Sequence, residues 1–123
     1  MTKGQAIQNF WSGLGIPAYD ETSVPDNAEF PYITYSVHIG AVGDICPTNV
    51  SLWDRSYSWK WISEKTEYIS GMIARMNPPS IKIDGGRLYI TKGTPFAQRL
   101  GDPSDDMIRR MLLNINYEFL TET

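Results

Sequence analysis

The sequence predicts an α+β fold: an antiparallel or mixed β-sheet of about four to five strands, with two helices packed on one face. Three observations lead to this prediction. Apolar residues recur at helical spacing in two short stretches, they alternate with polar residues in three longer ones, and a glycine pair separates two very short apolar runs. The length of 123 residues suits a single domain over residues 1–123.

The first stretch predicts a short amphipathic helix. Thr2 and Gln5 have the spacing of a capping box, and Gly13 and Gly15 are expected to end the helix. The apolar residues between them recur at helical spacing: Ile7, Phe10, Trp11 and Leu14. Residues 16–29 contain two prolines and many Asp, Asn, Ser and Thr residues, so we expect a loop there.

From residue 30 the apolar period changes to two, which predicts two long strands paired as an antiparallel hairpin with its tip at Gly40–Asn49. The first strand turns these residues inward: Ile33, Tyr35, Val37 and Ile39. The second, from Val50, turns these inward: Trp53, Tyr57, Trp59 and Trp61. Leu52 and Ile62 then fall on its polar face.

A second helix is expected from Ser63, which can cap it, with Arg75 suited to the dipole of its last turn. Its expected buried stripe is Ile69, Met72, Ile73 and Met76. A short hairpin over 81–90 turns at Gly85 and Gly86, and a polar loop follows from Lys92 to Asp106.

The last strand alternates clearly, and its expected inward residues are Met111, Leu113, Ile115, Tyr117 and Phe119. With the hairpin prediction, this places a set of inward strand residues beneath the two helices. The strand residues are Tyr35, Trp59, Trp61, Leu113 and Ile115, and the helix residues are Trp11, Ile69 and Met72.

The composition argues against several classes of protein. The formal net charge is −3 and the sequence pI is about 5.0, whereas nucleic-acid binders usually carry a basic patch. The single cysteine excludes an internal disulfide and favours a reducing compartment. No signal-peptide core and no run of about 18 apolar residues is present, so we expect no membrane contact.

Candidate catalytic groups are few, and the sequence predicts no enzyme, cofactor or metal site. His38, the sole histidine, falls on the solvent side of its strand, and a Cys46/His38 dyad lacks any recognisable signature. Asp102, Asp105 and Asp106 lack the spacing of a calcium loop, which favours a solvated turn. A base-stacking platform is another interpretation of Trp53, Tyr57, Trp59 and Trp61, but their alternation favours core packing.

The order of elements resembles the tail terminator, or tail completion, proteins of long-tailed (siphovirus-like) bacteriophages. The residues that carry the resemblance are the strand opening at 30–35 (Phe-Pro-Tyr-Ile-Thr-Tyr), the alternation at 53–61 and the closing 116–119 (Asn-Tyr-Glu-Phe). It covers nearly the whole chain.

The resemblance implies a hexameric ring that caps the tail tube, ends its polymerisation and offers a surface to head-tail connector or neck proteins. DNA would pass through the lumen without specific binding. The protein would lie at the neck end of the virion tail, after assembly in the host cytoplasm. Two alternatives stay open: another phage neck or tail component, such as a head-tail joining protein or a tube-like subunit, and a small cytoplasmic enzyme or ligand-binding module.

Apolar residues in the two long expected loops suggest where such a ring makes contacts. Val42 and Ile45 lie in the hairpin tip, and Phe96 and Leu100 lie in the loop 92–106. Apolar side chains add no stability to a loop that is exposed to water, so we expect these residues to contact neighbouring subunits or the tube. Charged residues at the rim would set the orientation of the contact. Those charged residues are Arg99 and Asp102. The alternative is that Phe96 and Leu100 fold back on their own core. Leu112 and Leu120, on the polar side of the last strand, suggest a further surface covered by a partner.

Overall fold

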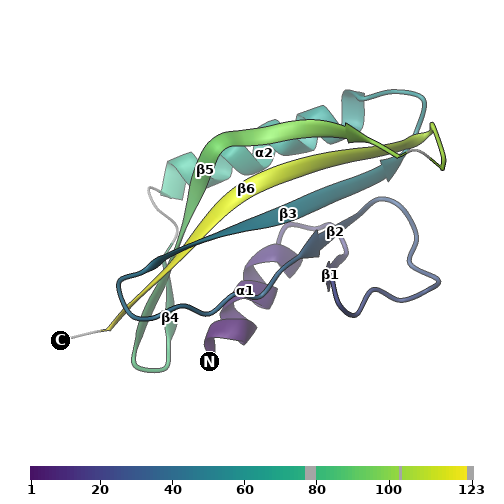
Figure 1. Cartoon of the computed structure of the whole chain (residues 1–123). Coiled ribbons are helices and arrows are strands. Elements are labelled where there is room, and N and C mark those ends of the chain that lie inside the picture. Colours follow the sequence, from purple (N-terminus) through teal and green to yellow (C-terminus); the bar gives the residue numbers. More distant parts are fainter. Residues whose placement is uncertain (77–79, 103, 122–123) are drawn as a thin grey trace.

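The computed structural model describes residues 1–76, 80–102 and 104–121. Within them the chain forms an α+β fold of two helices and one mixed six-stranded sheet, with strand order β1-β2-β3-β6-β5-β4 (Figure 1). The elements are α1 (Lys3–Ser12), β1 (Ala18–Asp20), β2 (Tyr32–Tyr35), β3 (Ile45–Arg55), α2 (Lys60–Met76), β4 (Ser80–Ile83), β5 (Gly86–Gly101) and β6 (Ile108–Thr121). β1 pairs with β2 in parallel and every other pair is antiparallel. The sheet exceeds the expected four to five strands because β1 lies in the stretch expected to be a loop.

The predicted capping box begins α1. The Gln5 N–H donates to Thr2 Oγ1 at 3.2 Å, and the Thr2 N–H donates to Gln5 Oε1 at 2.8 Å, so two amides at the helix start are satisfied. Ile7 and Trp11 are fully buried. The helix therefore docks through the apolar stripe that its sequence predicted.

β2 is shorter than expected. It ends at Tyr35, the last residue paired with β1 on one side and with β3 on the other. The residues after Tyr35 have no neighbouring strand to pair with, so the chain leaves the sheet. Ile39, which lies in this segment, is 61% exposed. The prediction that Val37 and Ile39 point into the core was wrong.

β3 starts at Ile45 rather than Val50, and its buried parity is the reverse of the predicted one. Leu52 is fully buried, whereas Trp53 is half-buried on the opposite face. The strand ends at Arg55, so Tyr57 and Trp59 are not strand residues. The alternating aromatic residues therefore lie in three different structures: Trp53 in the strand, Tyr57 and Trp59 in the bend, and Trp61 in the helix. Alternation indicates a common face only within one strand, so it misled the prediction here.

α2 begins at Lys60, whose N–H donates to Ser58 Oγ at 3.0 Å, and not at Ser63 as predicted. Trp61 lies in its first turn and is half-buried. Ile62 is fully buried, contrary to the polar position expected for it. It heads the buried stripe of the helix, which continues through Thr66, Ile69 and Ile73, while Met72 is half-buried. The side chain of Met76 lies outside the described residues.

The short hairpin is present, with Gly85 at φ +81° in its turn. Its second strand then continues, because β5 runs to Gly101 and replaces most of the expected loop Lys92–Asp106. A bulge interrupts its pairing with β6 between Lys92 and Ala97. The part of β5 that extends past its pairing with β4 exposes many side chains. Its sequence therefore lacks the alternation of apolar and polar residues that predicts a strand, and it was predicted to be a loop.

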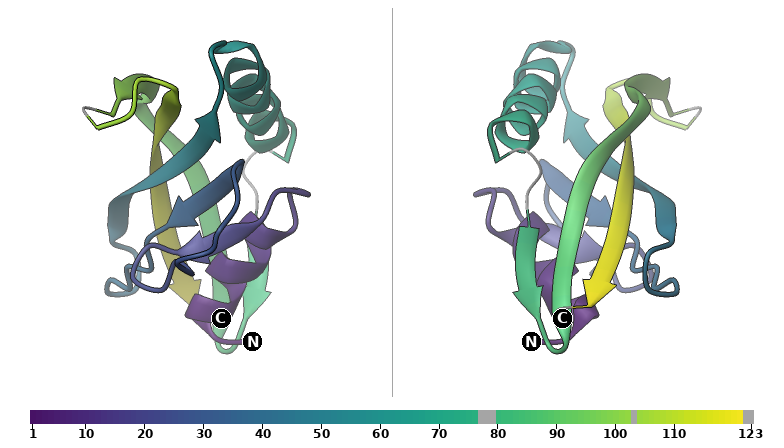
Figure 2. Two further views of the ribbon diagram at one scale, coloured as in Figure 1. Left: turned by 90° about the vertical axis from the view of Figure 1, so that its right-hand side faces the viewer. Right: turned by 90° about the vertical axis from the view of Figure 1, so that its left-hand side faces the viewer.

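β6 lies at the centre of the sheet, and its predicted parity is confirmed: Met111, Leu113, Ile115, Tyr117 and Phe119 are all buried. α1 lies against β1, β2 and β4, and α2 lies against β3, β5 and β6 (Figure 2). The Trp11 Nε1–H donates to the Tyr117 hydroxyl at 2.9 Å in the interior. This bond joins the first helix to the central strand.

Candidate functional site

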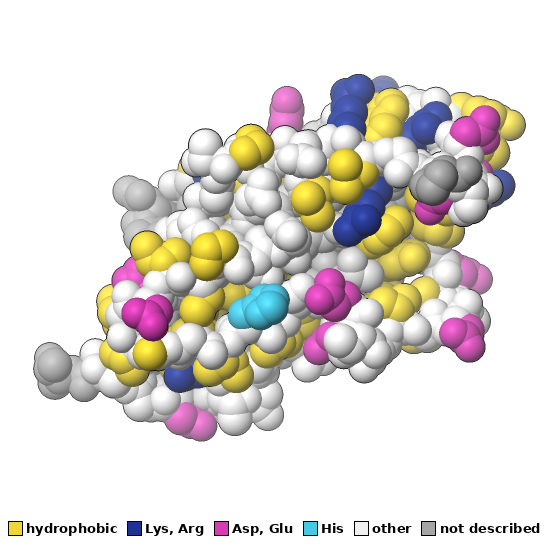
Figure 3. All heavy atoms as spheres, in the orientation of Figure 1, with side chains coloured by type: hydrophobic (Ala, Val, Ile, Leu, Met, Phe, Trp, Pro, Cys, Tyr) yellow, Lys and Arg dark blue, Asp and Glu magenta, His cyan; other side chains and the backbone are white. Residues whose placement is uncertain are grey.

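One end of the sheet carries exposed apolar side chains. Ile39, Val42 and Ile45 are 61%, 55% and 61% exposed, and Leu120 is 38% exposed. These four residues form what we call the apolar end. Ile45 lies opposite Glu118, and Val42 lines a small pocket together with Leu120. In Figure 3 hydrophobic side chains gather on the left, where β3 begins and β6 ends in Figure 1.

Local backbone structure brings the apolar end together. The Asp44 N–H donates to the Ala41 carbonyl at 3.1 Å, which closes a turn that contains Gly43 at φ +84°. The Gly43 N–H donates to the Phe119 carbonyl at 2.9 Å and ties this turn to the end of β6. The exposed residues of the turn are thus held against the sheet.

The opposite end is built from arginine and aromatic side chains. The guanidinium carbons of Arg99 and Arg109 lie 4.9 Å and 5.3 Å from the centre of the Trp59 ring. Arg109 also donates to the Asp106 carbonyl at 2.7 Å and to the Tyr57 carbonyl at 3.2 Å. Cations over an indole face gain from its ring quadrupole. We call Trp59, Arg99, Arg109 and Tyr57 the arginine end.

A row of aromatic side chains crosses the sheet face opposite to Tyr117, which we call the outer face. Tyr32 on β2 lies between Tyr19 and Trp53, with ring centres 5.9 Å and 6.3 Å away. Arg110 covers the Trp53 ring at 4.6 Å, and its Nε donates to Ser51 Oγ at 3.0 Å. The ring faces of Trp53 are therefore taken up by neighbours, which does not suit a platform for stacking bases.

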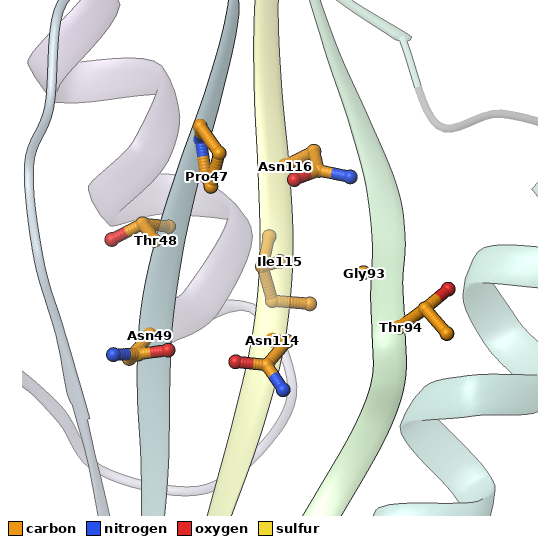
Figure 4. A pocket seen from close by; sticks show the side chains of 8 residues that line it. All are labelled: Pro47, Thr48, Asn49, Gly93, Thr94, Asn114, Ile115 and Asn116. Carbon is orange, nitrogen blue, oxygen red and sulfur yellow. The ribbon is translucent and has the colours of Figure 1, made fainter.

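A pocket of about 400 Å³ lies beside this row, where β3, β6 and β5 run next to one another (Figure 4). Its polar side chains are Asn49, Asn114, Asn116 and two threonines, with Gly93 at the bulge. Asn114 Nδ2 donates to the Pro95 carbonyl at 2.6 Å. Amides can bind a polar group, but the lining holds no His, Lys, Cys, Asp or Glu that could transfer a proton or activate a threonine hydroxyl.

The predicted contact residues fall into two separate groups. Val42 and Ile45 belong to the apolar end, and Arg99 belongs to the arginine end. Leu100 lies on β5 opposite Arg110, whereas Ile45 lies opposite Glu118. The partner positions Arg110 and Glu118 are eight residues apart along β6, about 26 Å at the usual rise of a strand.

The other two predicted contact residues are engaged within the chain. Phe96 is half-buried against the core, which agrees with the alternative that it folds back on its own subunit. Asp102 Oδ1 accepts bonds from the Ser104 hydroxyl at 2.6 Å and from the Ser104 N–H at 2.8 Å. These bonds lower the pKa of Asp102, the hydroxyl more than the amide.

The acidic cluster stabilises its own turn. Asp105 accepts from the Met107 N–H at 2.9 Å and pairs with Arg55 at 3.0 Å, and the Met107 bond is the larger cause of its lowered pKa. Within the described residues, no group of three or more His, Cys, Asp or Glu is placed to hold a metal ion. His38 is exposed, and Cys46 is a half-buried free thiol in β3.

Sequence reasoning missed the arginine end, because it placed Trp59 in the core of a strand. The only available signal was the polar bend at 56–58 before the helix. None of the helices in the described part of the chain is long and apolar enough to cross a bilayer. No protein-family model, curated protein or solved structure matches this chain.

Proposed function

We propose that this chain is the tail terminator subunit of a long-tailed bacteriophage. In this proposal it forms a hexameric ring that caps the tail tube, ends tube polymerisation and offers a surface for head attachment, and it is a structural protein with no enzymatic activity. The observation that carries the proposal is that the sheet has two unlike ends, one apolar and one rich in arginine and aromatic residues. A ring between two different neighbours needs subunits whose two ends differ.

The two ends then belong to the two faces of the ring. We assign the apolar end to the tail tube, because exposed apolar residues at one place are typical of a surface that a partner covers. Arg99 and Arg109 at the other end suit a more polar contact with neck or connector proteins, since arginine and aromatic residues are enriched in interfaces. DNA would cross the lumen without specific binding, in line with the net charge of −3.

We also place both helices on the sheet face that carries Tyr117. The bond from Trp11 of α1 to Tyr117 supports this, as does the membership of Ile69 of α2 in the same core cluster as Leu113. The outer face, with its arginine-capped aromatic row, is then free of helices and available at the inner or outer wall of the ring.

Electron microscopy of the purified protein in negative stain, together with light scattering, tests the proposal. We expect closed rings with about six times the chain mass of 13.9 kDa. Long tubes would favour a tube-like subunit instead, and monomers at every concentration would contradict a ring-forming protein.

Complementation tests the biological role. A phage that lacks the protein should make tails of irregular, excessive length that do not join heads, and the supplied protein should restore normal particles. Particles with normal tail length but unattached heads, in the absence of the protein, would point to a head-tail joining role.

A further inference from the structure

We infer that neighbouring copies of this chain meet through opposite edges of the sheet, an acidic edge at β1 and a basic edge at β4 and β5. This inference rests on the proposed ring and names the surfaces that close it. The partner is a second copy of the same chain. The two ends of the sheet then stay free for the tube and the neck.

The acidic edge comes from the first part of the chain. Residues 4–54 contain six Asp or Glu residues and no Lys or Arg. Four of the six lie at the end of β1 or in the loop after it: Asp20, Glu21, Asp26 and Glu29. β1 is an edge strand, and Glu21, Asp26 and Glu29 are exposed. Asp20 accepts bonds from the Thr22 N–H and hydroxyl, which lower its pKa and keep it ionised.

The basic edge comes from a later part. Residues 60–100 contain seven Lys or Arg and three Glu or Asp residues. Lys82 on β4 and Lys92 on β5 are exposed. Lys92 Nζ donates to Ser70 Oγ at 3.1 Å, so this cation is held in position on the surface.

The two edges are the outermost strands of one curled sheet. Strands β2, β3, β6 and β5 lie between β1 and β4 in the strand order, and α1 packs against both of these edge strands. Within the described residues two ion pairs occur, Met1 with Asp84 and Arg55 with Asp105, and neither joins the two edges. The exposed charges of each edge are therefore available to pair with charges of opposite sign on another molecule.

The opposite charges of the two edges also favour one symmetry of contact between copies over another. A two-fold contact would set an edge against its own copy and bring like charges together, which disfavours a closed dimer. A head-to-tail contact sets an acidic edge against a basic one and leaves an unused edge on each side. Such a contact repeats from copy to copy, and it closes as a ring where the rotation between neighbours completes a full turn.

Charge reversal at each edge tests the inference. One variant combines Glu21→Lys with Asp26→Lys, and the other combines Lys82→Glu with Lys92→Glu. Each variant alone should lose the ring, with at least about a tenfold higher concentration needed for half-assembly. An equimolar mixture should restore rings, because the reversed edges of the two variants are complementary to each other and can alternate around an even-numbered ring. The variant with all four substitutions should form rings alone.

Two control variants carry the same changes of net charge away from the edge strands. They combine Lys60→Glu with Arg75→Glu, and Glu64→Lys with Asp106→Lys, and all four of these residues are exposed. Both controls should assemble like the parent chain. Circular dichroism and thermal melting of every variant establish that it is folded.

The outcomes separate the two proposals. If the parent chain forms rings and the edge variants do so equally well, the edge contact is wrong and the ring stands. If each edge variant loses the ring but their mixture does not regain it, the edges do not pair with each other, and the inference again fails. If the parent chain never forms rings, the proposed function fails and the edge contact fails with it.

Discussion

At the scale of single residues, the hydrogen bond between Trp11 and Tyr117 is a polar contact inside the core. Both side chains are fully buried, so neither group can bond to water. We expect Tyr117→Phe to lower the free energy of unfolding by about 1–3 kcal/mol, because it leaves the indole N–H of Trp11 buried without an acceptor. Urea denaturation measures the change. Tyr57→Phe, at a residue that is 84% exposed, is the control and should stay within about 0.5 kcal/mol of the parent.

The same tyrosine predicts an alkaline limit of stability. Burial raises the pKa of Tyr117 above the ordinary value of 10.0, and the bond from Trp11 only partly opposes this. The folded state therefore holds the proton more tightly than the unfolded state, so the contribution of Tyr117 is complete below pH 10 and is lost as the pH rises above that value. Stability measured from pH 8 to 11.5 should fall more steeply for the parent than for Tyr117→Phe. Parallel curves above pH 10 would contradict the assignment to Tyr117.

At the scale of elements, the start of α2 separates the observed helix from the expected one. Ser58 accepts the Lys60 N–H, whereas the Ser63 hydroxyl lies inside the helix and accepts from Arg99 at 3.4 Å. Loss of a capping hydroxyl costs about 0.5–2 kcal/mol, so Ser58→Ala should lower stability by that amount. Ser63→Ala should change it by less than about 0.5 kcal/mol, since alanine favours a helix interior. Thermal melting of the two variants decides the comparison, and the opposite order would restore the predicted start.

A second prediction at this scale concerns the stability of the bulge in β5. A Cβ atom on Gly93 would lie 2.9 Å from Asn114 Cβ and 3.1 Å from the Asn114 carbonyl oxygen, and this backbone oxygen belongs to the central strand. Gly93→Ala should therefore destabilise the protein by about 1–3 kcal/mol through overpacking. Gly101→Ala is the matched control, because a Cβ there meets nothing within 4 Å. Equal melting temperatures for the two variants would show that β5 can shift away from β6.

At the scale of the whole molecule, the apolar end can be separated from ring closure. Val42→Ser combined with Ile45→Ser removes two exposed side chains, so stability should change by no more than about 0.5 kcal/mol per site. We expect the rings to form, because the sheet edges are untouched, but to cap the tube poorly and to leave overlong tails in complementation. Electron microscopy of particles measures tail length.

Tyr57→Ser serves as the control for the apolar-end variant, since it alters an exposed aromatic residue at the opposite end of the sheet. Its tails should keep normal length. Tails of normal length with the apolar-end variant would remove Val42 and Ile45 from the contact with the tube.

Local signals were enough for some elements. Thr2 and Gln5 specified the start of α1, because a capping box satisfies its own amides and needs nothing from the rest of the fold. β6 was predicted correctly in type and parity because a central strand with one face in the core alternates along its whole length, as Met111 to Phe119 do. The β4–β5 hairpin followed from its glycine pair.

Tertiary structure decided the rest, because burial depends on which segments cover a residue. Trp53 and Leu52 differ by one position, and only the packing of the sheet determines which of them lies in the core. The candidate surfaces could not be located from the sequence for the same reason. Val42 and Leu120 line one pocket, and Trp59 lies under Arg99 and Arg109, across long stretches of chain. The sequence by itself determined that residues 4–54 carry only acidic charges and that residues 60–100 are mainly basic, whereas the strand order placed some of these charges on opposite edges of one sheet.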